Sequence, residues 1–229
     1  MSDLPPGSPL RTSLACIVGG IVALVSLFTL LAEEVVMDGR TWLDRATTIE
    51  VRQYATPERT EAVRAATELG SSWLAAIICG SILLWLCWQR RWSTAVAIGG
   101  VFFIAKLLET GLKLTFERAR PTVVPHLQDA GGYSFPSGHT MTAVITYGLL
   151  AAILVGQLNG RARYVPPIMA ALIIVTVGFS RVYLGVHYLT DVLAGTLVAG
   201  ACLILAISAL HLLDRPGLSA PVSSAAPGD

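Results

Sequence analysis

The sequence predicts an all-α, polytopic membrane protein with six transmembrane helices. First, 54% of the 229 residues are hydrophobic and only 14% are charged, which is too apolar for an ordinary soluble domain. Second, apolar runs long enough to cross a bilayer recur along the chain. Third, these runs lack the alternation of a membrane β-barrel strand, so we expect helices, which satisfy their backbone hydrogen bonds internally.

The predicted spans divide the chain into one membrane domain with two short ends. We expect the N-terminal segment 1–12 and the Ser/Ala/Pro-rich tail 214–229 to be disordered. The domain between them covers 13–213. Its six predicted spans are 13–32, 69–88, 94–112, 139–157, 165–180 and 190–213.

Charge and cysteine usage exclude several classes of function. The formal net charge is +1, with 16 basic residues scattered among 15 acidic ones, so no basic face predicts a nucleic-acid partner. All four cysteines lie in apolar stretches, where a thiol usually packs. We therefore expect no disulfide and no metal cluster.

The connections between spans predict an orientation. Segments 89–93 and 158–164 are short and basic, which is typical of cytoplasmic loops, so both termini are expected inside and the long segments 33–68 and 113–138 outside. A raw count opposes this, with nine Lys or Arg outside and six inside, but the rule applies best to short loops. Segment 33–68 is either one or two helices at the membrane interface or a solvated loop with little helix.

Three polar clusters lie at the ends of predicted spans. They follow the third span, open the fourth, and join the fifth to the sixth, so with six spans all three must meet on one side of the membrane. The clusters are Lys113 with Arg120 and Pro121, then Pro136, Ser137, Gly138 and His139, then Ser180, Arg181, His187 and Asp191.

The cations of these clusters predict a phosphate site. Lys113, Arg120 and Arg181 supply the donors that a tetrahedral dianion requires. Ser137 fits a helix N-cap, and Gly138 would let an anion approach the free amides at the helix start. Taken singly, an arginine here is more often an interfacial anchor, and a Ser-Gly pair a simple cap.

The histidines add a reactive group to this site. His187 and Asp191 are four residues apart, a spacing that places both side chains on one helical face. The carboxylate can then hold one ring nitrogen and leave the other as nucleophile or base. The alternative is an interfacial histidine beside a capping aspartate. A second histidine, His139, would lie beside the same anion, ready to donate a proton. Two histidines and a carboxylate could also bind a metal, but the cations nearby would repel it.

Two ionisable residues lie within the third predicted span. Lys106 and Glu109 fall on roughly the helix face that leads to Lys113, and ionisable groups inside a membrane are functional candidates. We expect them to form a buried ion pair that supports Lys113.

The spacing of these clusters resembles the type 2 phosphatidic acid phosphatase superfamily. The matching pattern is Lys, six residues, Arg-Pro, then Pro-Ser-Gly-His, then Ser-Arg, five residues, His, three residues, Asp, and all eleven positions are present. The resemblance implies a six-helix membrane phosphatase without a metal or other cofactor. It also implies that His187 is the nucleophile, that His139 is the acid and that Asp191 orients His187. The phosphoryl oxygens would be held by Lys113, Arg120, Ser137, Gly138 and Arg181.

From the residues and the resemblance together we predict a hydrolase of a lipid mono- or diphosphate, working through a phosphohistidine. The substrate class is undecaprenyl diphosphate, phosphatidylglycerol phosphate or phosphatidate, and the location is a bacterial inner membrane with the site on its outer face. A phosphotransferase that passes the same phosphoryl group to a second lipid is one alternative. A non-catalytic anion transporter is another. The sequence leaves the oligomeric state open.

Overall fold

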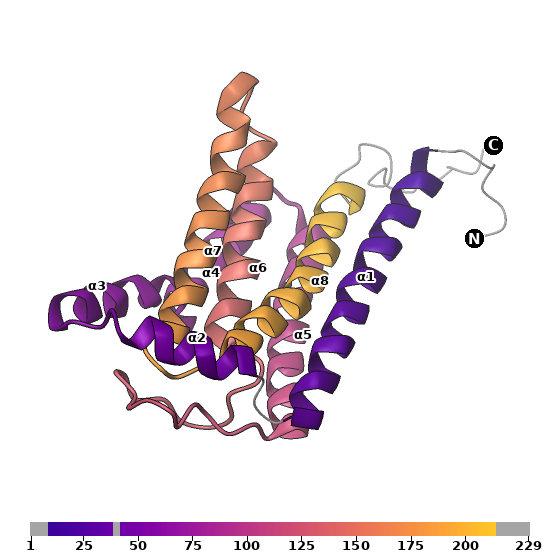
Figure 1. Ribbon diagram of the computed structural model, residues 1–229. Helices are drawn as coiled ribbons and strands as arrows, with labels where there is room; N and C mark the ends of the chain where they lie inside the picture. Colours follow the sequence, from indigo (N-terminus) through magenta and orange to yellow (C-terminus); the bar gives the residue numbers. More distant parts are fainter. Residues whose placement is uncertain (1–8, 39–41, 214–229) are drawn as a thin grey trace, which may run out of the picture.

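The structure is a computed structural model that describes residues 9–38 and 42–213, and all its regular elements in these ranges are helical (Figure 1). The all-α prediction is thus confirmed. The elements are α1 (Pro9–Asp38), α2 (Trp42–Arg52), α3 (Pro57–Thr67), the 3-10 turn η1 (Glu68–Gly70), α4 (Ser72–Trp88), α5 (Trp92–Phe116), α6 (Gly138–Val155), the 3-10 turn η2 (Gly160–Tyr164), α7 (Val165–Tyr183) and α8 (Leu189–Leu213).

Six stretches within the described residues are long and apolar enough to cross a membrane, as predicted. Helix α1 begins at Pro9, inside the segment 1–12 that was expected to be disordered. The rest of that prediction, residues 1–8, and the predicted tail 214–229 lie outside the described residues. The stretches are Ser13–Val36, Pro57–Trp88, Trp92–Phe116, Gly138–Val155, Gly160–Tyr183 and Leu189–Leu213.

The outer faces of these helices are suited to lipid rather than water. Large apolar side chains point outward, and Leu84, Val96 and Val175 each expose 68–74% of their surface. Exposed tryptophans mark the ends of the bundle, with Trp73 opening α4 and Trp88 ending it. Tryptophan prefers the interface between hydrocarbon and water, so this pattern fits a helix bundle that spans a bilayer.

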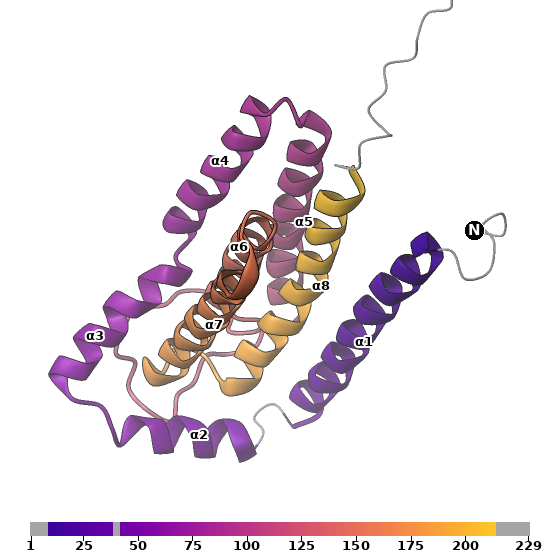
Figure 2. The ribbon, with the colours of Figure 1, turned by 90° about the horizontal axis from the view of Figure 1, so that it is seen from above.

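Helices α6 and α8 form the centre of the bundle. Helix α6 packs against α7 and α8, and α8 also contacts α1 and α5, so that α1 lies at one edge (Figure 2). Close approach of α8 to the start of α6 requires Gly195, where a Cβ atom would lie only 2.8 Å from the Ser137 carbonyl oxygen. This contact brings the first turns of both helices together.

Segment 33–68 contains two helices, α2 and α3, which lie across one end of the bundle (Figure 1). The residues at the start of helix α3 stabilise it, because Thr56 caps it by accepting a hydrogen bond from Arg59 N (3.3 Å) and Pro57 opens its first turn. This segment packs its apolar side chains on the end of α7 and the residues that follow it. Val51, Ala55 and Val63 contact the cluster of Tyr183, Leu184 and Val186. Of the two expected alternatives, helices are therefore observed rather than a loop with little helix.

Labelling of single cysteines tests the arrangement of the two ends. In a variant whose four native cysteines are replaced by serine, cysteines at Glu58 and Asp129 should react with an impermeant maleimide added from one side. Cysteines at Gln89 and Asn159, which lie in the short connections, should react only from the other side. All four positions are exposed, so access depends on the side alone. Different accessibility within either pair would contradict the six-span arrangement.

Candidate active site

His187 and Asp191 meet at the start of α8. Nδ1 of His187 lies 3.3 Å from Oδ2 of Asp191, and both side chains are almost completely buried. The expectation that both residues share one helical face is wrong, because α8 begins at Leu189 and His187 lies in the loop before it. Asp191 belongs to the first turn and accepts the Tyr188 backbone N–H (2.8 Å), so the carboxylate caps the helix while holding the imidazole.

The partners of His187 fix its tautomer. Nη1 of Arg120 lies 3.3 Å from Nε2 of His187. A guanidinium can only donate, so Nε2 must accept with its lone pair and the ring proton must be on Nδ1, facing Asp191. Burial lowers the pKa of His187 from 6.5 to about 4, against the opposing effect of Asp191. His187 is therefore a neutral imidazole at pH 7, with Nε2 unprotonated.

The side chain of Arg120 is held in place by backbone carbonyl groups. It donates to the carbonyl oxygens of Gly131 (2.7 Å), Gly132 (3.1 Å) and Val186 (2.7 Å). These bonds connect the loop after α5 to the loop before α8. Because the guanidinium is anchored on several sides, one of its amino groups stays directed at the reactive nitrogen of His187.

Arg181 places a second guanidinium in the site from the last turn of α7. Its Nη1 donates to Thr67 Oγ1 (3.0 Å) and Gln128 Oε1 (3.3 Å). Its Nε is buried and has no hydrogen-bond partner among the described residues. A buried charged donor without a partner is costly, so the arginine is suited to bind an anion.

The first turn of α6 supplies the predicted amides. Ser137 occupies the N-cap position as expected, but its hydroxyl makes no capping bond, because it accepts a hydrogen bond from Thr140 Oγ1 (3.0 Å). Its backbone N–H donates to the Asp191 carbonyl oxygen (3.0 Å), which ties α6 to α8. A Cβ atom at Gly138 would overlap with Oε1 of Glu109, so a larger residue there would displace this carboxylate.

Lys113 lies in the last turn of α5 rather than in the following loop, and it is paired as expected. Its ammonium is 2.7 Å from Oε1 of Glu109, whose Oε2 is 2.8 Å from the ammonium of Lys106. The Glu109 side chain is 8% exposed, whereas that of Lys106 is 63% exposed. The expected ion pair between Lys106 and Glu109 is therefore present, but it is buried only on the Glu109 side.

His139 lies in the first turn of α6, beside the other cluster members. Its backbone packs so closely on η1 that a Cβ atom at Gly70 would be 3.0 Å from the His139 carbonyl oxygen. The imidazole lies within electrostatic range of Arg181 and His187. The structure thus brings the second histidine to the same end of the bundle as His187, while its role as acid stays a prediction.

Several residues of the site were not predicted from the sequence. Ser134 donates its hydroxyl hydrogen to Oδ2 of Asp191, and Arg118 Nη1 donates to Oδ1 at 2.5 Å. Arg118 is one of the six residues between Lys113 and Arg120, which the motif leaves unspecified, and only its charge could have indicated a role. Asp44 and Thr67 come from α2 and α3, far away in sequence, and no local pattern distinguishes them.

The chain is similar in sequence to known membrane phosphatases. A model of the PAP2 superfamily matches residues 94–214, more than half of the chain. Phosphatidylglycerophosphatase B of Bacillus subtilis is 34% identical over 177 residues, covering 76% of this chain and 86% of that protein. Decaprenylphosphoryl-5-phosphoribose phosphatase of Mycolicibacterium smegmatis is 31% identical over 131 residues, covering 56% of this chain and 64% of that protein.

Solved structures extend the comparison to the fold. The crystal structure of a PAP2 type phosphatidylglycerolphosphate phosphatase from Bacillus subtilis aligns with a TM-score of 0.70 and 32% identity, covering 81% of this chain and 93% of that one. The structure of Aquifex aeolicus LpxE, at 21% identity and a TM-score of 0.52, shares the fold and covers 75% of this chain and 96% of that one. The chain therefore belongs to the PAP2 superfamily and is a membrane lipid phosphate phosphatase.

Proposed function

We propose that this protein hydrolyses phosphatidylglycerol phosphate to phosphatidylglycerol and inorganic phosphate, through a phosphohistidine on His187. The observation that carries the proposal is the environment of His187. Asp191 orients the ring through Nδ1, and Nε2, which faces Arg120, is left unprotonated with its lone pair. The choice of lipid is supported by two similar proteins of Bacillus subtilis, phosphatidylglycerophosphatase B and the phosphatidylglycerolphosphate phosphatase of known crystal structure.

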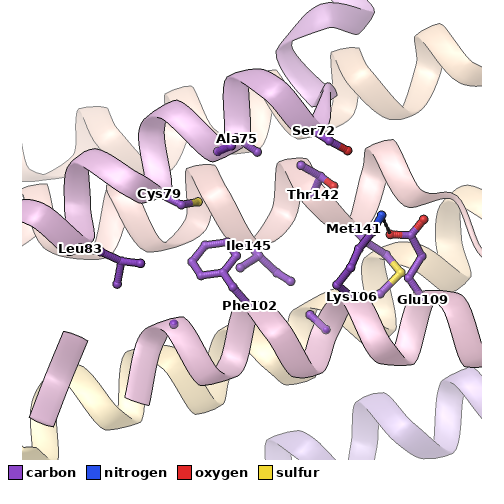
Figure 3. A pocket seen from close by; sticks show the side chains of 13 residues that line it. Ser72, Ala75, Cys79, Leu83, Phe102, Lys106, Glu109, Met141, Thr142 and Ile145 are labelled. Carbon is purple, nitrogen blue, oxygen red and sulfur yellow. Dashed lines mark hydrogen bonds and ion pairs between the residues drawn. The ribbon is translucent and has the colours of Figure 1, made fainter. Parts of the chain in front are cut away.

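An apolar groove beside the site fits the lipid tail. It lies between α4, α5 and α6 and has a volume of about 290 Å³. Figure 3 shows apolar side chains along its length, with Lys106 and Glu109 at one end. Because Glu109 also contacts Lys113 and abuts Gly138, this polar end adjoins the proposed phosphate site. A tail lying in the groove would thus bring its headgroup to His187. The apolar part is lined by Ala75, Ala76, Cys79, Leu83, Phe102, Met141 and Ile145.

In the proposed first step, Nε2 of His187 attacks phosphorus as the bond to the lipid oxygen breaks. The leaving alkoxide takes a proton from His139, so a neutral lipid alcohol departs. The imidazole becomes a phosphorylated cation that retains its Nδ1 proton, and the carboxylate of Asp191 stabilises that charge. In the second step His139 removes a proton from water, which attacks phosphorus and releases phosphate and neutral His187.

The cations would stabilise the phosphoryl group during both steps. Arg120 is already directed at Nε2, and Arg181 has a buried donor to offer. Lys113 and the free amides at the start of α6 would hold further phosphoryl oxygens. Only interactions that strengthen as charge redistributes in the transition state would raise the rate, and rigidly anchored donors meet that condition.

We also propose that this end of the protein faces the outside of a bacterial inner membrane. The support comes from the two connections at the opposite end, which are short and basic, as cytoplasmic loops are. Their basic residues are Arg90, Arg91, Arg161 and Arg163.

Phosphate release by detergent-purified protein tests the proposed substrate. Phosphatidylglycerol phosphate should be hydrolysed at least about tenfold faster, by kcat/KM, than phosphatidate or undecaprenyl diphosphate, a difference of about 1.4 kcal/mol. Turnover should persist in EDTA, because the cations replace a metal. Lipid product without free phosphate would instead indicate a phosphotransferase, and phosphate transport without turnover an anion transporter. Loss of activity in EDTA with recovery in magnesium would refute the metal-free mechanism.

The pH dependence of kcat/KM tests the protonation states. Attack requires neutral His187, whose pKa is lowered by burial to about 4, so the acid limb should bend near pH 4 instead of 6.5. Donation requires protonated His139, so the rate should fall again once the pH is high enough for His139 to lose its proton. Burial of the neutral imidazole also makes folding less favourable as pH falls from 6.5 towards 4, so unfolding should be monitored in parallel. An acid limb at or above pH 6.5 with folded protein would contradict this state of His187.

Two substrates distinguish the roles of the histidines. A lipid alkoxide must be protonated as it leaves, so His139→Ala should lose about 100-fold or more in single-turnover release of lipid alcohol. A phenolate leaves unaided, so the same variant should recover much of its phosphoenzyme formation with an aryl phosphate. His187→Ala lacks the nucleophile and should be inactive with both substrates.

Acid-labile phosphohistidine should be trapped in parallel, with His126→Ala as the matched control outside the motif. Rescue of His187→Ala by the aryl substrate would show that the roles are reversed. Loss of the phosphoenzyme in His139→Ala with both substrates would show the same.

A further inference from the structure

We propose that Arg118 and Asp44 are positioning residues of the reaction, because Arg118 bridges Asp44 to Asp191 and thereby fixes the carboxylate that holds His187. Neither residue belongs to the eleven-position motif. The inference rests on the proposed role of His187 as nucleophile.

The bridge is a single buried guanidinium between two buried carboxylates. Nη1 of Arg118 lies 2.5 Å from Oδ1 of Asp191, and Nη2 lies 2.7 Å from Oδ2 of Asp44. The Arg118 side chain is 5% exposed and both aspartate side chains are 0% exposed. Its guanidinium carbon lies 4.4 Å from the ring centroid of Tyr188, so the plane of the fork is also supported by an aromatic ring. The group therefore has a defined orientation.

Asp44 ties the bridge to the start of α8. Its Oδ1 accepts the Thr190 backbone N–H (2.9 Å) and its Oδ2 accepts the Thr190 hydroxyl (2.7 Å). A carboxylate at the N-terminus of a helix satisfies a free amide and opposes the positive end of the helix dipole. Asp44 thus acts as a cap supplied by α2, and the helix that carries Asp191 is fixed by a residue 146 positions away in the chain.

The charges of the bridge complement the proposed reaction. Two carboxylates and one guanidinium leave a net charge of −1 beside a neutral His187. Attack on phosphorus turns the imidazole into a cation, which the surplus negative charge then balances. A buried ion cluster of this kind contributes little to stability compared with apolar packing, so its presence beside the nucleophile favours a functional role.

Other charged groups also face His187. Arg120 contacts it from the loop after α5, and Arg181 and His139 act on it from α7 and α6. These groups stay unchanged when the bridge is altered. Changes at Asp44 and Arg118 therefore report on the bridge and on the hydrogen bonds that both side chains make with Thr190. Removing the negative charge should favour neutral His187, whereas removing the positive charge should favour its protonated form.

The experiment compares Asp44→Asn, Arg118→Gln and the double variant in purified protein. Each single change should lower kcat by about 100-fold, the usual effect of misplacing a catalytic group, with KM changed less than about threefold because neither side chain is expected to contact the lipid. The acid limb of the pH profile should move to lower pH in Asp44→Asn and to higher pH in Arg118→Gln. The double variant removes one charge of each sign. Its fold-decrease in kcat should therefore be much smaller than the product of the fold-decreases in the two single variants.

The controls separate charge from packing. Thr48→Val alters a buried side chain one turn along α2, whose hydroxyl donates to the Asp44 backbone oxygen (2.7 Å), and it should keep the wild-type profile. Arg118→Lys keeps the positive charge but loses the planar guanidinium that contacts both carboxylates. It replaces Arg118→Gln in the experiment if that variant does not fold. It should lower kcat without moving the acid limb.

Multiplicative losses in the double variant, or acid limbs that stay in place or move in the same direction, would overturn the proposal. So would a Thr48→Val profile that matches that of Asp44→Asn. Phosphohistidine trapping distinguishes this failure from failure of the proposed function. Absence of the phosphoenzyme in the wild-type protein would refute the role of His187 as nucleophile. Formation of the phosphoenzyme at the wild-type rate in Asp44→Asn and Arg118→Gln would refute only the positioning role of these two residues.

Discussion

The ionised carboxylate of Asp191 must be stabilised where water does not reach it, and the active-site end is organised around this requirement. Its oxygens accept hydrogen bonds from the Tyr188 amide, the Ser134 hydroxyl and the guanidinium of Arg118, in addition to the imidazole of His187. These donors come from the loop before α8 and the loop after α5. A buried carboxylate without such donors would be protonated and could not orient the imidazole.

The bundle provides this arrangement because its helices approach each other closely at one end. Gly195 lets α8 lie against the start of α6, where the Ser137 amide donates to the Asp191 carbonyl oxygen. Elsewhere the helices bury apolar side chains and present apolar surfaces outward, as lipid requires. Polar chemistry is thus confined to one end of the bundle, beside an apolar groove whose polar end is marked by Glu109. This geometry suits a substrate with a charged head and a hydrocarbon tail.

Helices α2 and α3, which lie across one end of the bundle, also contribute residues to the site. They contribute Asp44, which caps α8, and Thr67, which accepts a hydrogen bond from Arg181. Their apolar side chains cover the segment between Tyr183 and Val186. The loop that carries His187 is therefore held from both sides, by α8 and by these two short helices, and its backbone is further fixed by bonds to the Arg181 carbonyl oxygen.

By itself, the sequence determined the all-α class, the six spans and the motif residues, because bilayer thickness imposes the length of apolar runs and phosphate chemistry requires particular side chains at span ends. Only the tertiary structure decided that His187 precedes its helix, that Glu109 abuts Gly138 and that Arg118 bridges Asp44 to Asp191. The contact of Glu109 with Gly138 and the bridge through Arg118 join residues far apart in the chain. No local periodicity or motif encodes such a pairing, which depends on how the helices pack.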